Sequence, residues 1–148
     1  MRPILVLLLA TLACSNPSSP DAGLKMETSV SASTVRAGES ITVDVQVTNV
    51  GFKTQFFTGS CPGPFIVLDS FGEMIGGPWD TGYCLAALSV SPTELVPGAS
   101  VTLTHVWTAR RLESGHPPLD PGTYRIQSEV RAASGLVRGG SIDVLVEG

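Results

Sequence analysis

The chain has 148 residues, 43% of them hydrophobic, with sixteen glycines and eleven prolines. This suits one small domain with a turn at short intervals. Nine basic against thirteen acidic residues give a formal net charge of -4, and because the basic residues form no extended cluster, nucleic acid is excluded as a partner.

Residues 1–14 predict a targeting segment rather than part of the fold. Arg2 provides a short basic start, and Ile4–Ala10 is an apolar run too short to span a bilayer. The ending Thr11-Leu12-Ala13-Cys14 resembles a bacterial lipobox, which implies cleavage before Cys14 and lipidation of that cysteine. The alternative is ordinary secretion. The expected location is therefore the bacterial cell envelope, with the chain lipid-anchored at the outer membrane or cell surface, or else secreted.

Residues 15–26 are rich in Ser and Pro at their start and predict a flexible tether, so that the folded domain would span residues 27–148. From Glu27 an alternating pattern predicts a first strand through Val30, Ala32 and Thr34. A turn is expected at residues 36–39.

Residues 41–48 form the cleanest strand pattern of the chain, because four apolar side chains alternate with four polar ones. Asn49-Val50-Gly51 closes this strand. A more aromatic strand is predicted at Phe52–Phe57. A third, Phe65–Leu68, is apolar on both faces and should therefore be covered on both sides.

Residues 69–73 predict a hairpin turn that returns towards Met74 and Ile75. Residues 76–82 are expected to be irregular, and a short strand is expected at Leu85–Val90. Pro97-Gly98 turns into an alternating face that ends at Trp107. After a polar excursion at residues 110–118, the last strand contains Ile142, Val144 and Val146. No segment keeps the periodicity of a helix.

The stretch from Asp120 to Ile126 has the spacing of a tyrosine corner. In immunoglobulin-like sandwiches a tyrosine of this kind packs its ring inside while its hydroxyl bonds to upstream backbone. The residues that would form it here are Asp120, Gly122 and Tyr124. With seven to eight strands at short, regular spacing, the sequence predicts an all-β, immunoglobulin-like antiparallel β-sandwich.

Four turn motifs carry a resemblance to a known family: Thr48-Asn49-Val50-Gly51, Asp69–Gly72, Leu95-Val96-Pro97-Gly98 and Pro121-Gly122-Thr123-Tyr124. In their order along residues 35–146 they resemble the intracellular proteinase inhibitor (BsuPI) family of immunoglobulin-like domains. The resemblance implies a small non-enzymatic domain, with protease inhibition as one activity of the family.

Cys61 and Cys84 are the two cysteines that follow Cys14. Behind a signal peptide, in an oxidising compartment, they are expected to form a disulfide, which by the chain-entropy relation would stabilise the fold by about 3 kcal/mol. The alternatives are a reactive thiol or a metal-binding pair.

The residues that could carry catalysis or metal binding are few. His105 and His116 are the only histidines, and no nucleophile elbow accompanies them, so no catalytic residues are predicted and the protein is expected not to be an enzyme. Asp69, Glu73 and Asp80 could converge on calcium, but their spacing matches no known loop, and turn chemistry explains Asp69. Neither a metal nor a cofactor is therefore predicted.

Four aromatic residues between the second strand and the middle of the chain are candidates for binding a partner: Phe57, Phe71, Trp79 and Tyr83. Exposed aromatic rings on constrained loops can anchor a partner at low entropic cost, and the alternative is that they cap the ends of the sandwich. The sequence thus favours a non-catalytic binding module whose partner is a protein or an envelope polymer, with membrane attachment through the lipid anchor. Proteinase inhibition is the second hypothesis.

Overall fold

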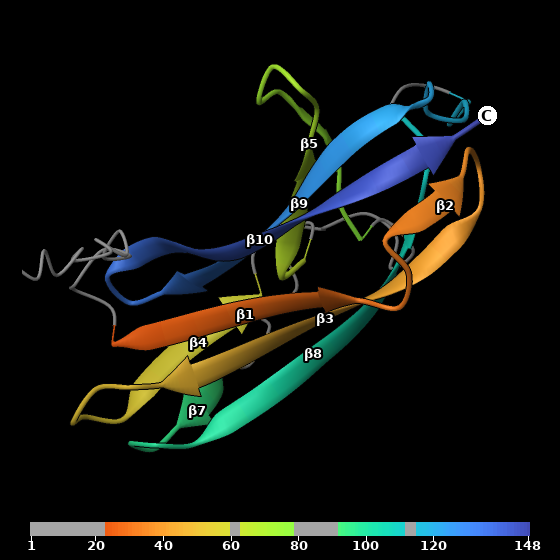
Figure 1. Ribbon diagram of the computed structural model, residues 1–148. Coiled ribbons are helices and arrows are strands. Elements are labelled where there is room, and N and C mark those ends of the chain that lie inside the picture. The colour runs from red at the N-terminus through yellow and green to blue at the C-terminus, as the bar shows by residue number, and fades with distance from the viewer. Residues whose placement is uncertain (1–22, 60–62, 79–91, 112–114) are drawn as a thin grey trace, which may run out of the picture.

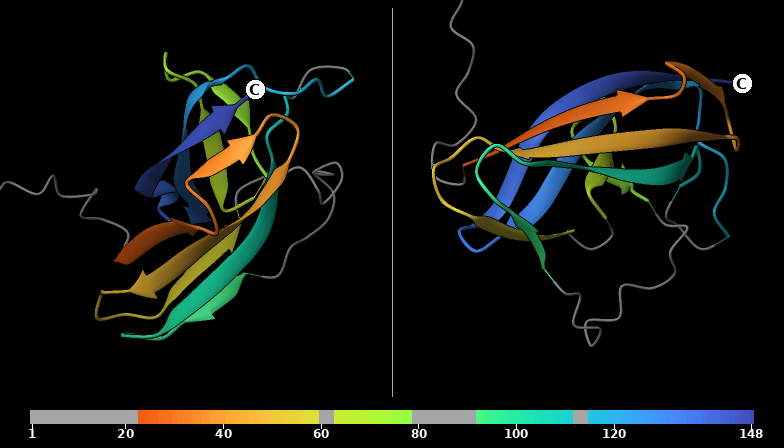
Figure 2. Two further views of the ribbon diagram at one scale, coloured as in Figure 1. Left: turned by 45° about the vertical axis from the view of Figure 1, so that its right-hand side comes forward. Right: turned by 90° about the horizontal axis from the view of Figure 1, so that it is seen from below.

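The structure is a computed structural model that describes residues 23–59, 63–78, 92–111 and 115–148 (Figure 1). Two β-sheets face one another, as the two views in Figure 2 show, and this confirms the predicted immunoglobulin-like β-sandwich. Ten strands lie in the described residues, more than the seven to eight expected. These residues form no helix, and hence none long and apolar enough to cross a membrane.

The smaller sheet has three antiparallel strands in the order β1 (Leu24–Val30), β3 (Ser40–Asn49) and β8 (Ser100–Thr108). The alternation predicted for β3 is confirmed, because Ile41, Val43, Val45 and Val47 are all buried. On β8 only Trp107 is fully buried, while the alternate residues before it are half-buried. The apolar face of β3 therefore supplies the middle of the core.

The larger sheet has seven strands arranged around β9 (Gly122–Ala132). One edge of β9 pairs with β10 (Gly135–Glu147), and the other edge is shared by β4 (Gln55–Gly59) and β5 (Phe65–Leu68) at different points along its length. The remaining strands extend the sheet: β2 (Thr34–Arg36) pairs in parallel with β10, β7 (Thr93–Leu95) pairs with β4, and β6 (Met74–Gly76) pairs with β5.

The first strand begins at Leu24, three residues before the start at Glu27 that the pattern predicted. Leu24 and Met26 belong to β1 and are buried, while Lys25 and Glu27 between and after them are exposed. The predicted tether of residues 15–26 therefore overlaps the first strand. The alternation already starts at Leu24, because β1 pairs with β3 along its whole length, from Leu24 opposite Asn49 onwards.

Two other strand predictions need correction. The aromatic strand was expected from Phe52, but β4 begins at Gln55, and Phe52 lies in the preceding turn with its side chain fully exposed (101%). The short strand β7 at Thr93–Leu95 was not predicted, because three residues are too few to show a period. By contrast, Phe65, Ile66 and Val67 of β5 are all buried, as a run that is apolar on both faces requires.

A bulge in β10 joins the two sheets. The register with β9 shifts between Arg138 and Ser141, and a Cβ at Gly139 would lie 2.4 Å from Cβ of Met26 on the opposite sheet. The carbonyl of Gly140 accepts hydrogen bonds from Thr28 of β1 (2.9 Å) and from the buried hydroxyl of Ser128 on β9 (3.0 Å). The bulge thus needs small residues because β1 crosses β10 at this point.

Candidate binding surface

The four aromatic residues predicted to bind a partner differ in where they lie in the structure. Phe57 is 1% exposed and belongs to the core, so its prediction as a binding residue was wrong: on β4 it faces the opposite sheet. Phe71 is 89% exposed. Trp79 and Tyr83 lie outside the described residues. Among the four candidates, Phe71 is therefore the one that the described part of the chain shows exposed and able to contact a partner.

Phe71 is carried by the turn between β5 and β6, and the side chain of Asp69 holds this turn. The Oδ1 atom of Asp69 accepts hydrogen bonds from the backbone N–H groups of Phe71 and Glu73, both at 2.9 Å. The backbone adds a bond from Asp69 N–H to the Glu73 carbonyl (3.0 Å), and Gly72 adopts a positive φ of 82°. The turn predicted at residues 69–73 is confirmed, and its conformation is fixed before any partner arrives.

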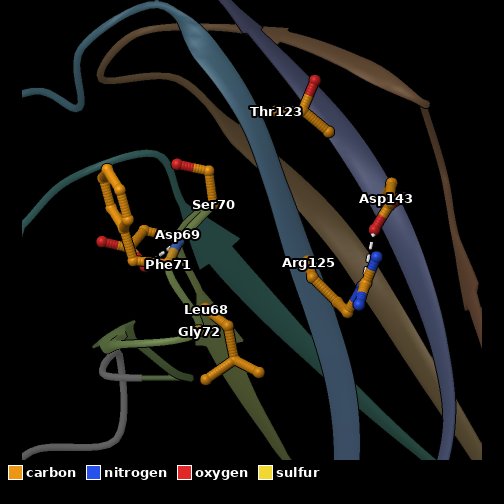
Figure 3. Close-up of a pocket in the computed structure, with 8 residues that line it drawn as sticks. All are labelled: Leu68, Asp69, Ser70, Phe71, Gly72, Thr123, Arg125 and Asp143. Carbon is orange, nitrogen blue, oxygen red and sulfur yellow. Dashed lines mark hydrogen bonds and ion pairs between the residues drawn. The ribbon is translucent and has the colours of Figure 1, made fainter.

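A hollow of about 450 Å³ lies between this turn, the first part of β9 and the last part of β10. In Figure 3 the turn residues lie on one side, and Arg125 and Asp143 lie on the other. Its lining is Leu68, Asp69, Ser70, Phe71, Gly72, Thr123, Arg125 and Asp143. The hollow thus combines an apolar wall with a charged one, as small binding sites commonly do.

The charged wall is an ion pair across two neighbouring strands. Arg125 and Asp143 are opposite one another in the register of β9 and β10, and Nε of Arg125 donates to Oδ1 of Asp143 at 2.9 Å. This hydrogen bond and the charge of Asp143 raise the pKa of Arg125 above its usual value. This bond uses Nε, so the Nη groups of Arg125 can donate to a carboxylate or carbonyl of a ligand.

A second hollow of about 230 Å³ continues the first around the base of the turn. The two share Asp69, Ser70, Phe71 and Thr123, and the second extends to Tyr124. Phe71 therefore stands between two connected depressions. A side chain of a partner could pack against either face of its ring.

Tyr124 makes the contact that a tyrosine corner requires. Its side chain is buried, and its hydroxyl donates to the backbone carbonyl of Asp120 at 2.9 Å. Burial raises the pKa of this hydroxyl above its usual value, and the Asp120 carboxylate raises it further. Gly122 begins β9 beside the ring. The three residues thus fix the end of β9 from which Thr123 and Arg125 project.

The side chain of Asp120 also forms an ion pair with Arg111, which lines the second hollow. Arg111 comes from the segment after β8, so this pair ties a third part of the chain to the rim of the site. Two ion pairs, Arg111–Asp120 and Arg125–Asp143, therefore lie beside the two hollows.

Neither of the two histidines lines the hollow beside Phe71. His105 is half-buried on β8, in the other sheet, and His116 is exposed in the loop before β9, where it has a positive φ of 45°. Within the described ranges no group of three or more His, Cys, Asp or Glu side chains could hold a metal ion. Asp69 serves the turn instead, and Asp80 lies outside the described residues.

The predictions for the cysteines stay untested. Cys14, with its predicted lipidation, and Cys61 and Cys84, with their predicted disulfide, all lie outside the described residues.

Sequence reasoning missed Thr123, Arg125 and Asp143 as parts of the site. Arg125 follows the buried Tyr124 in β9 and is therefore exposed on the opposite face, but the sequence gives no indication that Asp143 lies opposite it or that the turn at residues 69–73 folds beside it.

No protein-family model and no curated protein matches the chain. Solved structures match it in fold only. The alkylpurine DNA glycosylase AlkC of Pseudomonas fluorescens matches with 14% identity and a TM-score of 0.52, and the match covers 88% of this chain and 32% of AlkC. The sporulation control protein Spo0M of Bacillus subtilis matches with 14% identity and a TM-score of 0.52, and the match covers 85% of this chain and 50% of Spo0M. A CARDB domain from Pyrococcus furiosus matches over 94% of this chain and all of its own length, with 17% identity and a TM-score of 0.48. The chain thus spans a third to a half of the first two proteins, and what it shares with them is a β-sandwich.

Proposed function

We propose that this protein is a non-catalytic binding module of the bacterial cell envelope, attached to a membrane by a lipid on Cys14, and that it binds its partner with the hollow beside Phe71. The observation that carries the proposal is the ring of Phe71, which is 89% exposed on a turn whose conformation is fixed by Asp69. A rigid exposed aromatic side chain loses little entropy on binding and buries much apolar area, and such residues commonly dominate binding energy.

The chemistry of the hollow favours a protein segment as the partner. An apolar side chain of the partner would pack against Phe71 and Leu68, and a carboxylate or carbonyl beside it would accept from Arg125. An envelope polymer is the other class of partner that this surface could receive.

Photo-crosslinking in intact cells tests the proposal. Benzoylphenylalanine is introduced at position 71, and as a control at position 106, where Val106 is 43% exposed on the other sheet. We expect a discrete protein adduct from position 71 and none from position 106. A cell-wall-bound adduct from position 71 would assign the partner to the envelope polymers. Equal adducts from both positions, or none from either, would refute the site.

Affinity for the captured partner gives the energetic test. Phe71→Ala is expected to weaken binding about thirtyfold, since the loss of a central aromatic contact typically costs about 2 kcal/mol. Phe52→Ala is the matched control, because Phe52 is equally exposed but lies in the turn between β3 and β4. Arg125→Gln should weaken binding as well, if the partner presents a carboxylate.

The rigid turn also supports the second function, proteinase inhibition. An exposed phenylalanine at the tip of a fixed turn has the side chain that the apolar primary pocket of a chymotrypsin-type protease accepts. Titration of chymotrypsin, subtilisin and elastase with the purified protein tests this function. Loss of protease activity at a one-to-one ratio, and its recovery with Phe71→Ala, would establish inhibition. Full activity at a large excess of the protein would exclude it for these enzymes.

A further inference from the structure

Three large apolar side chains gather at one end of the sandwich, away from the hollow beside Phe71. Phe52 is 101% exposed, Val50 is 59% exposed and Val96 is 54% exposed. Val50 and Phe52 lie in the turn between β3 and β4, and Val96 lies in the turn between β7 and β8. We refer to these three residues as the apolar tip.

The buried side chain of Asn49 holds the two turns of the apolar tip together. Its Nδ2 atom donates to the carbonyls of Lys53 and Leu95, each at 2.8 Å, and its Oδ1 atom accepts from Gly51 N–H at 2.9 Å. The backbone of Asn49 adds two bonds to the turn that follows β7, one to Gly98 and one to Ala99, both at 2.9 Å. The tip is therefore a rigid projection, although its own side chains contribute nothing to the core.

The described chain begins at this same end. The carbonyl of Gly23 accepts from the N–H groups of Val50 (2.8 Å) and Gly51 (3.2 Å), so the point where the chain enters the domain is bonded to the tip. Figures 1 and 2 show the start of β1 beside the turn between β3 and β4 and the turn between β7 and β8, at the end opposite the C-terminus. A chain anchored at its N-terminus therefore presents this end to its anchor.

The length of chain that precedes Gly23 sets how far the tip can be from a bilayer. Gly23 follows Cys14 by nine positions, and a fully extended chain covers at most about 3.5 Å per residue, so Gly23, which is bonded to the tip, lies within about 30 Å of a lipid on Cys14. This distance is comparable to the length of a ten-residue strand such as β3, about 33 Å. The tip is thus held at high effective concentration next to the membrane surface.

We infer that the apolar tip docks onto the phospholipid bilayer and orients the domain on the membrane. Aromatic side chains favour the interface between lipid and water, and aliphatic ones beside them add apolar area. Lys53, which is exposed and adjacent to Phe52, would place its ammonium group among the anionic lipid headgroups. In this orientation the tip faces the lipid and the hollow beside Phe71 points away from it, free to meet a partner. The inference rests on the proposed lipid anchor.

Depth-dependent quenching tests the docking. The full chain, produced in a bacterial host and extracted from its membranes, is reconstituted into phosphatidylcholine–phosphatidylglycerol vesicles that contain brominated lipids. Phe52→Trp reports on the tip, and Phe71→Trp is the matched control at an equally open site. The wild-type protein, with Trp79 and Trp107, gives the background. We expect quenching and a blue shift of the indole at position 52 and neither at position 71.

Equal quenching at both positions, or none at position 52, would overturn the inference. If position 52 instead shows a blue shift without vesicles that grows with protein concentration, the tip is an interface between two copies of the chain, and membrane docking is also excluded. As a further check, Phe52→Ala should raise the rate of dissociation from vesicles about tenfold, as expected when a phenyl ring is lost from an apolar environment.

A second arm separates this inference from the lipid anchor itself. Intact mass of the extracted protein shows whether Cys14 is the first residue and carries acyl chains. If it does not, the lipid anchor is refuted, and the same variants are then attached through an N-terminal histidine tag to vesicles with a nickel-chelating lipid. Quenching at position 52 alone would still support docking of the tip, and its absence would refute docking independently of the natural anchor.

Discussion

Replacement of Asn49 by alanine should destabilise the fold more than its single position suggests. The Asn49 side chain is fully buried and makes three hydrogen bonds to backbone groups of two different turns. Each such bond contributes about 1 kcal/mol net, and the carbonyl and N–H groups left behind lose their partners in a site with little access to water. We therefore expect Asn49→Ala to lower the free energy of unfolding by about 3 kcal/mol.

Urea unfolding, followed by the fluorescence of the buried Trp107 and by far-UV circular dichroism, measures this loss. Two controls sharpen it. Asn49→Asp keeps the volume but would place a carboxylate against two carbonyl oxygens, so it should destabilise at least as much as alanine does. Thr48→Ala removes only an exposed hydroxyl contact to Ser100 (2.8 Å) and should cost less than about 1 kcal/mol. An Asn49→Ala loss no larger than that of Thr48→Ala would refute the role given to Asn49.

Three further changes test other parts of the fold. Tyr124→Phe removes the hydroxyl bond to Asp120 and should cost about 1 kcal/mol at neutral pH. Because the pKa of Tyr124 is raised in the folded state, the contribution of its protonated hydroxyl to stability is complete below pH 10 and is lost as the pH rises through the folded-state pKa. In urea unfolding at a series of pH values, the wild type should therefore lose stability above pH 10 more steeply than Tyr124→Phe does. Gly139→Ala should destabilise by more than 1 kcal/mol in thermal unfolding, since its Cβ would collide with Met26, and an unchanged midpoint would contradict the close approach of the sheets at the bulge. Val45→Ala, at a fully buried site, should cost about 2 kcal/mol in the same assay, and a neutral effect would place β3 outside the core.

The local pattern of the chain was sufficient to predict the architecture. Side chains alternate along β3 and β9 because a strand has a period of two, and one buried face is enough to reveal that period in ten or eleven residues. The spacing of Asp120, Gly122 and Tyr124 predicted a bond within a few residues of chain, and such short-range contacts depend little on the rest of the fold. Short elements such as β7 could not be predicted, because three residues contain no period.

The binding surface and the apolar tip depend on which distant segments meet. Leu68 faces Arg125, and Arg125 faces Asp143, only because β9 pairs with β5 along one edge and with β10 along the other. In the same way, Phe52 lies fully exposed in the turn before β4, because this strand begins at Gln55 and not at Phe52 as predicted. The sequence by itself determined the strands and turns, since these follow from neighbours along the chain. Only the tertiary structure decided which aromatic residue entered the core and which remained at the surface, because that choice depends on strand register, and a shift of one residue moves every side chain to the opposite face.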